Sequence, residues 1–313
     1  MADAITLDRV TKRYGRTAVV SELSLTVARG EMFGLIGPDG AGKTTTIRLI
    51  CGLLAADGGS VRVLDLSPTR DHRRLTRSVG YLSQRFSLYG DLSVDENIAF
   101  FADIHGLRDY RDRRERLLEM TQLTPFRARL ADRLSGGMKQ KLALACTLVH
   151  EPELIVLDEP TTGVDPVSRR EFWKLLSQFL AHGITIVMAT PYLDEAERCA
   201  RVALLHEGRL LALDRPDALR ATLPGSLFEV IAPDHQNVAD AIKRMPGVTG
   251  VEMFGERAHV RLAAGAGPDA PARIGAALAS HAGIRVLSIR PVAASLEDVF
   301  IDKVTGDRMQ AGG

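Results

Sequence analysis

Residues 31 to 54 read "EMFGLIGPDGAGKTTTIRLICGLL", a buried apolar strand that runs through a glycine-rich turn into a helix. The turn, "GPDGAGKT" at 37–44, fits the pattern G-x-x-x-x-G-K-[ST] in the strand–turn–helix context that this pattern requires. Gly37, Gly40 and Gly42 let the backbone curl so that successive N–H groups face one concavity, beside the positive end of the helix. We therefore predict a phosphate-binding loop; the alternative is a glycine turn that holds no ligand.

The side chains of this loop indicate a nucleotide with Mg²⁺. Lys43 adds a full positive charge for the β- and γ-phosphates, and the Thr44 hydroxyl can ligate the metal. The carboxylate of Asp39 would be repelled by a triphosphate, so we expect it to point away. The residues that we assign to the triphosphate-binding loop are Gly37, Asp39, Gly40, Ala41, Gly42, Lys43, Thr44 and Thr45.

A second buried strand, "LIVLDEP" at 154–160, ends in two adjacent carboxylates. Asp158 suits a role beside Mg²⁺, and Glu159 suits polarising the water that attacks the phosphate. A strand points successive side chains to opposite faces, so both can reach one site only where the strand ends and the backbone turns, and Pro160 supplies that stop. Taken alone, such a pair is more often a solvated turn; in the same α/β core as Lys43 it predicts a catalytic site.

The stretch "RLSGGMKQKLALACTLVHEP" at 133–152 predicts a second helix start that can bind an anion. Ser135 is a candidate N-cap, and Gly136 and Gly137 leave the backbone N–H groups of the first turn accessible. For an isolated sequence of this kind, an ordinary capped helix is the alternative.

Composition excludes several classes of protein. The net charge of +1 gives no electrostatic reason to expect a nucleic-acid partner. Three cysteines, far apart and without metal-ligand spacing, argue against a disulfide framework or a zinc site and fit a reducing cytosol. No window reaches the roughly 18 unbroken apolar residues of a membrane span. We therefore expect a soluble chain whose work at a membrane would need partners.

The order of the predicted elements indicates two domains. Residues 1–222 read as an α/β core that is preceded by antiparallel strands and interrupted by a helical subdomain at about 91–150. Residues 223–305 read as strand–helix–strand–strand–helix–strand, the order of a ferredoxin-like α+β domain, followed by one more helix. We expect residues 306–313 to form a flexible tail.

Together, the phosphate loop, "LSGGM" and "LIVLDEPTTGVDP" resemble an ATP-binding-cassette (ABC) ATPase over about residues 4–220. The resemblance implies a RecA-like core, ATP and Mg²⁺ as cofactors, and two cassettes packed head to tail, so that Ser135, Gly136 and Gly137 close over the ATP of the partner. It also implies roles for Tyr14 in stacking on adenine, Gln84 in sensing Mg²⁺ and the attacking water, and Asp165 in crossing the dimer seam.

Each of these three residues also has an ordinary structural interpretation. Tyr14 could be a surface aromatic, Gln84 a loop amide and Asp165 an N-cap before a proline. The family pattern favours the functional roles.

The segment that follows Gln84 places Phe86, Leu88 and Tyr89 in a loop. Some of these residues could belong to the core, but the resemblance implies a docking surface for a membrane-spanning permease subunit, which would hold the chain at the inner face of the cell membrane. The single cassette, "SQRFSLYGDLSVDENI" and "SLEDVF" are similar to the ATP-binding subunits of daunorubicin-resistance-type multidrug exporters. A homodimer or a heterodimer of ATP-binding subunits fits this resemblance.

The sequence departs from the family pattern at Pro191, where "TIVMAT" is followed by proline and the family has a histidine that bonds the γ-phosphate. Proline cannot supply this hydrogen bond, so we expect hydrolysis to be retained but slowed. Thr190 is a candidate substitute, whereas His182 and His206 read as surface histidines.

Three functions therefore compete. The first is the ATP-hydrolysing subunit of an exporter, and the second is a soluble ABC ATPase without a transport role. The third is a nucleotide-gated module with impaired hydrolysis, against which the intact Glu159 argues.

Overall fold

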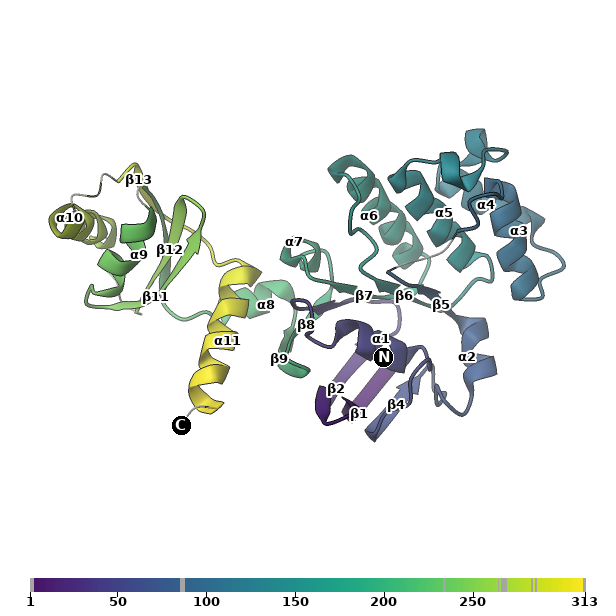
Figure 1. Cartoon of the computed structure of the whole chain (residues 1–313), viewed down its shortest axis with the longest axis horizontal. Coiled ribbons are helices and arrows are strands. Elements are labelled where there is room, and N and C mark those ends of the chain that lie inside the picture. The colour runs from purple at the N-terminus through teal and green to yellow at the C-terminus, as the bar shows by residue number, and fades with distance from the viewer. Residues whose placement is uncertain are drawn as a thin grey trace. The chain divides into compact units, whose positions relative to one another are not determined.

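The structure of the protein is a computed structural model that describes residues 3–84, 88–232, 235–263, 265, 269–282, 284 and 286–311. The chain forms two compact units, Met1–Pro216 and Asp217–Gly313 (Figure 1). The division at Pro216 lies a few residues before the domain boundary that we expected after residue 222.

A six-stranded sheet with the strand order β5-β6-β7-β3-β8-β9 is the centre of the first unit. Neighbouring strands from β5 to β8 are parallel, and the edge strand β9 is antiparallel to β8. Every residue of β3, β6 and β7 is buried, which explains why their sequences are apolar without alternation. The strands are β3 (Met32–Ile36), β5 (Val79–Leu82), β6 (Leu154–Asp158), β7 (Thr185–Thr190), β8 (Arg201–His206) and β9 (Arg209–Asp214).

A second, three-stranded sheet in the order β2-β1-β4 confirms the antiparallel strands predicted at the start of the chain. It consists of β1 (Asp3–Tyr14), β2 (Thr17–Ala28) and β4 (Gly58–Val63). Its alternating apolar side chains join the parallel sheet and helix α1 (Lys43–Ile50) in one core, whose members include Ile5, Leu23, Phe33, Leu35 and Ile47. This core fixes the base of the phosphate loop, because the loop connects β3 to α1.

The remaining helices of this unit cover the parallel sheet and form the predicted helical insertion between β5 and β6 (Figure 1). The insertion contains α3 (Val94–Ile104), α4 (Arg111–Met120), two 3₁₀ turns (Thr124–Phe126 and Ala131–Arg133) and α5 (Gly136–Leu148). The other helices are α2 (His72–Ser78), α6 (Pro166–Ala181) and α7 (Leu193–Ala196).

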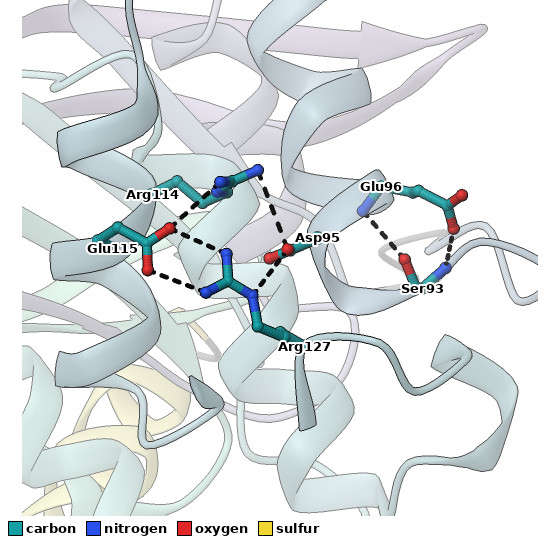
Figure 2. Close-up of polar contacts among 6 residues, drawn as sticks. All are labelled: Ser93, Asp95, Glu96, Arg114, Glu115 and Arg127. Atoms are coloured by element: carbon teal, nitrogen blue, oxygen red, sulfur yellow. Dashed lines mark hydrogen bonds and ion pairs between the residues drawn. The ribbon is translucent and has the colours of Figure 1, made fainter. Parts of the chain in front are cut away.

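Polar contacts connect the segments of the insertion, as Figure 2 shows. The guanidinium of Arg127 donates to Asp95 on α3 at 2.9 Å and to both carboxylate oxygens of Glu115 on α4 at 2.9 and 3.1 Å. Arg114 also donates to Glu115, and these hydrogen bonds, chiefly that of Arg127, lower the pKa of the Glu115 carboxyl. One arginine therefore joins the start of α3 to the middle of α4.

The second unit has the ferredoxin-like topology that the sequence predicts. Its four-stranded antiparallel sheet has the order β11-β12-β10-β13, which is the order expected when two strand–helix–strand units interlock. Helices α9 and α10 share an apolar core with one face of this sheet. The unit comprises α8 (Pro216–Ala221), β10 (Ser226–Ile231), α9 (His235–Lys243), β11 (Val248–Phe254), β12 (Arg257–Leu262), α10 (Ala270–Ala282), β13 (Ser288–Pro291) and α11 (Leu296–Ala311).

Helix α11 packs on β12 through charged groups. His259 lies 2.8 Å from Asp298, and Arg261 bonds Asp302, so two alternate residues of β12 hold one side of the helix. The helix continues to Ala311. The flexible tail that we expected from residue 306 is therefore helical up to that point, and residues 312–313 lie outside the described part of the chain.

The N-cap of α3 generates a stability prediction. Ser93 and Glu96 form a capping box, in which the Ser93 hydroxyl accepts from the Glu96 N–H at 3.3 Å and the Glu96 carboxylate accepts from the Ser93 N–H at 2.7 Å (Figure 2). Ser93→Ala should lower the free energy of unfolding by about 1 kcal/mol, because it leaves a backbone donor without a partner. Ser93→Thr, which keeps the hydroxyl, should lose much less. Urea unfolding measures both, and equal losses would contradict the capping role.

Candidate nucleotide site

The phosphate loop surrounds a hollow of about 310 Å³ in the first unit. Gly40 and Gly42 adopt positive φ values of 80° and 95°, and Gly42 is the N-cap of α1 in a left-handed conformation. Its carbonyl accepts from the Thr46 N–H at 2.9 Å, which starts the helix directly behind the loop. The residues that line the hollow are Val19, Asp39, Gly40, Ala41, Gly42, Lys43, Thr44, Thr45, Gln84 and Glu159.

Two glycines of the loop are required by close backbone neighbours. A Cβ atom at Gly37 would lie 2.2 Å from the Leu205 carbonyl oxygen, and one at Gly42 would lie 2.7 Å from the Val19 carbonyl oxygen. Both contacts are shorter than any Cβ atom tolerates, and neither partner is a flexible side chain. The loop is therefore held between β8 on one side and β2 on the other.

Lys43 places its charge at the bottom of the hollow. The side chain is only 4% exposed, and its Nζ donates to the carbonyl oxygens of Gly37 at 2.7 Å and Pro38 at 3.0 Å. The same nitrogen lies 3.7 Å from Glu159 Oε1. A buried ammonium with three oxygen partners is a strong fixed charge among the residues that line the hollow.

Asp158 lies directly behind Thr44, whose hydroxyl donates to Asp158 Oδ1 at 3.1 Å. Asp158 is 1% exposed. Burial raises the pKa of its carboxyl, and the charge of Glu159 adds to this rise, while the hydrogen bond from Thr44 opposes it. The pair of hard oxygen ligands is of the kind that Mg²⁺ prefers, so the residues present fit a magnesium site at the edge of the hollow.

Glu159 reaches the same site because the backbone turns at this residue. It has a φ of 48°, in the left-handed region, and its N–H donates to the Ala189 carbonyl on β7 at 2.9 Å. Gln84 Nε2 donates to Glu159 Oε2 at 2.9 Å. The structure therefore brings the three side chains that we predicted to be catalytic, Lys43, Gln84 and Glu159, around one hollow.

The predicted second anion site begins at Ser135. Ser135 caps α5 and accepts from the Met138 N–H at 3.3 Å, and both Ser135 and Gly136 are exposed. Gly137 is buried, and a Cβ atom there would lie 2.2 Å from the Ser168 hydroxyl and 2.4 Å from its Cβ on α6. The start of α5 therefore packs on the first turn of α6, and Gly137 makes this packing feasible.

Asp165 is the N-cap of α6 in this chain. Its Oδ1 accepts from the N–H groups of Val167 and Ser168, each at 3.0 Å, and hydrogen bonds from Ser168 lower its pKa. This is the ordinary interpretation that the sequence left open for Asp165. A role across a dimer seam stays a prediction.

Some predicted residues lie outside the hollow. Tyr14, at the end of β1, is 48% exposed and does not line it. Thr190 is buried and donates its hydroxyl hydrogen to Glu195 at 2.7 Å, so it has no hydrogen left for a phosphate and does not replace the missing histidine. His182 is exposed, His206 is partly buried, and neither lines the hollow.

The apolar segment after Gln84 is described only in part, because Phe86 lies outside the described residues. Tyr89 is 45% exposed, and its ring contacts Phe100 on α3 at a centroid distance of 4.4 Å. Leu88 is partly buried. A docking role for this surface stays a prediction. None of the helices in the described ranges is long and apolar enough to cross a membrane.

Sequence reasoning missed two residues near the site. Val19 lines the hollow, but its position depends on the packing of the antiparallel sheet against the loop and leaves no signal in the local sequence. Glu195 is 1% exposed and bonds Thr190, beside the end of β7. The only local signal for Glu195 is an acid four residues after Pro191.

Comparison with known proteins agrees with this geometry. A family model described as "ABC transporter" matches residues 20–162. The chain is 41% identical to the probable multidrug ABC transporter ATP-binding protein YbhF of Escherichia coli, over 98% of this chain but only 53% of that protein. It is 39% identical to the Nod factor export ATP-binding protein I of Paraburkholderia xenovorans, over 98% of both chains.

Solved structures show the same fold. An ATP-binding subunit of an ABC transporter superposes with a TM-score of 0.64 at 30% identity, covering 70% of this chain and 92% of that one. A dimeric ATP-binding cassette bound to ADP and Pi superposes with a TM-score of 0.61 at 26% identity, covering 67% and 98%. The fold is that of an ABC-type P-loop nucleotide-binding domain. The chain belongs to the ABC transporter ATP-binding family.

The buried carboxyl of Asp158 generates a pH-dependent prediction. The pKa of this carboxyl is higher in the folded chain than in the unfolded chain. Its contribution to the free energy of unfolding therefore falls as the pH rises from the unfolded pKa to the folded pKa. Asp158→Asn removes the charge but keeps an acceptor for Thr44. The variant without nucleotide should therefore melt at a higher temperature than the wild type at pH 7, with a smaller difference at about pH 4.

Thermal unfolding followed by circular dichroism, with wild type and variant compared at each pH, checks this expectation. Mg²⁺ and ATP should then raise the melting temperature of the wild type more than that of Asp158→Asn. A variant that melts below the wild type at pH 7 would contradict the cost of burying the Asp158 carboxylate. An equal rise in the melting temperatures of variant and wild type with Mg²⁺ and ATP would contradict the metal role.

Proposed function

We propose that this chain is the ATP-binding and ATP-hydrolysing subunit of an ABC exporter, with multidrug efflux as its function. The observation that carries the proposal is the convergence of Lys43, Gln84 and Glu159 on one hollow, with Thr44 and Asp158 at its edge. In this arrangement a buried positive charge, a carboxylate and an amide line one hollow together with the phosphate loop.

Each residue has a chemical role in the proposal. Lys43 and the loop N–H groups bind the β- and γ-phosphates, and Thr44 and Asp158, with Gln84, would hold Mg²⁺. A bound Mg²⁺ would supply charge neutralisation on the phosphate oxygens. Glu159 accepts a proton from, or orients, the attacking water, and its hydrogen bond with Gln84 fixes one carboxylate oxygen while leaving the other near Lys43.

A second copy and membrane subunits complete the proposal. We infer that two cassettes pack head to tail around two ATP, with Ser135, Gly136, Gly137 and Asp165 reaching the nucleotide of the partner and Tyr14 stacking on adenine. A homodimer and a heterodimer both fit this arrangement.

The names of the two relatives support export, and the chain spans about half the length of the Escherichia coli protein. Separate permease subunits would hold the chain at the inner face of the membrane and select the transported substrate.

One observation favours a second candidate function, a nucleotide-gated module with impaired hydrolysis. Pro191 follows β7 where the family has a histidine, and Thr190 donates its hydroxyl hydrogen elsewhere. If the missing donor is essential, ATP would close the dimer without being hydrolysed at this site.

Steady-state ATP hydrolysis with Mg²⁺ tests the choice. The wild type should turn over, and Glu159→Gln should lower kcat by roughly 100-fold or more while still binding ATP, because it removes the base. Glu119→Gln, an exposed carboxylate on α4, is the matched control and should keep wild-type turnover.

Pro191→His tests the missing donor directly. It should raise kcat by roughly 10-fold, the value of one hydrogen bond to a charged group. If the wild type is as inactive as Glu159→Gln while Pro191→His is active, the second candidate function is correct. Co-purification with a multi-span membrane protein separates the exporter from a soluble ABC ATPase.

A further inference from the structure

Glu195 is a buried carboxylate that none of the proposed catalytic steps uses. It lies in the short helix α7 and is 1% exposed. Its Oε2 accepts from the Thr190 hydroxyl at 2.7 Å, and its Oε1 accepts from the Thr161 hydroxyl. Both threonines are themselves 1% exposed. One carboxylate therefore bridges two buried hydroxyls that come from different parts of the chain.

The two threonines flank the catalytic end of the sheet. Thr161 follows Glu159 by two residues, and Thr190 is the last residue of β7, the strand that pairs with β6. The Glu159 N–H already donates to Ala189 on β7. The bridge through Glu195 adds a second connection between the same two segments, one residue further along β7.

The surroundings of Glu195 justify a charged residue. Burying a carboxylate is costly unless it is paired and hydrogen-bonded. Arg169 on α6 places its Nε 3.8 Å from Glu195 Oε1, and the ring of Tyr192 lies against the guanidinium of Arg169 at 5.1 Å. The N–H of Tyr192 donates to the Thr190 hydroxyl at 3.1 Å. The cluster thus connects β7, α7, α6 and the segment after β6.

We propose that Glu195 is a positioning residue for ATP hydrolysis: by joining Thr161 to Thr190, it holds the backbone turn that aims Glu159 at the hollow. A non-glycine residue at a φ of 48° is retained only where its surroundings hold it there. Pro191 has no N–H and no polar side chain, so it donates no hydrogen bond at the end of β7, and the Thr190–Glu195 bond joins this end of the strand to α7. This inference rests on the proposed ATPase function.

Glu195→Gln tests the inference in the full chain. The amide keeps the shape but replaces one acceptor oxygen with a donor, so one of the two threonine hydroxyls loses the acceptor that it has in the wild type. We expect kcat to fall about 10-fold or more, with the KM for ATP and the Kd for a non-hydrolysable ATP analogue within about 3-fold of wild type. Asp194→Asn, the exposed neighbour, is the matched control and should keep wild-type turnover.

A second pair of variants separates positioning from folding. Thr190→Val has the shape of threonine without its hydroxyl and should lower kcat as Glu195→Gln does, whereas Thr190→Ser keeps the hydroxyl and should restore most of it. Because the two groups act through one bond, Thr190→Val combined with Glu195→Gln should be little worse than either change alone.

The outcomes are distinct. Wild-type kcat in Glu195→Gln or in Thr190→Val would overturn the inference and leave the proposed function standing. The inference would also be overturned if analogue affinity, melting temperature and kcat all fell together in these variants and Thr190→Ser did not restore kcat. That pattern indicates a purely structural role. A wild type that binds ATP without hydrolysing it would overturn both the ATPase proposal and the inference.

Discussion

The site depends on the backbone turn at Glu159, where the strand that carries Asp158 ends. An extended strand would direct these two carboxylates to opposite faces, one behind Thr44 and the other into the sheet core. The positive φ of Glu159 and the bond from its N–H to Ala189 bring both to the hollow instead. The phosphate loop, the amide of Gln84 and the end of β7 are all arranged around this turn.

Three buried charged groups of this unit have neighbouring atoms that satisfy them. Lys43 has two carbonyl oxygens, Asp158 has the Thr44 hydroxyl, and Glu195 has two threonines and a nearby arginine. A charge buried without such partners would destabilise the fold. Each charged side chain therefore restricts the positions of the groups that bond it, as well as its own position. The helical insertion is different, because its connecting ion pairs around Arg127 are partly exposed and contribute less to stability.

Local patterns predicted most of the fold and the centre of the site. The phosphate loop and the Asp158–Glu159 pair follow from short motifs whose context is a strand and a helix, and the ferredoxin-like order follows from alternating periodicities. The sequence could not show that Thr190 bonds Glu195 or that Val19 reaches the loop, because these contacts arise from packing between separate segments. It also could not separate the capping role of Asp165 from a role in a dimer, since the same residue type serves both.

The contact between Gly137 and Ser168 joins the start of α5 to the first turn of α6. A side chain at Gly137 would collide with the first turn of α6, the helix that Asp165 caps. The neighbouring glycine, Gly136, is exposed and has open space around its Cβ position. A Gly137 variant that loses activity would not show whether this glycine contacts the nucleotide of a second cassette, because the substitution also disturbs the packing of α5 on α6 within its own subunit. A substitution at Gly136 avoids this problem and is the better test of a contact between two cassettes.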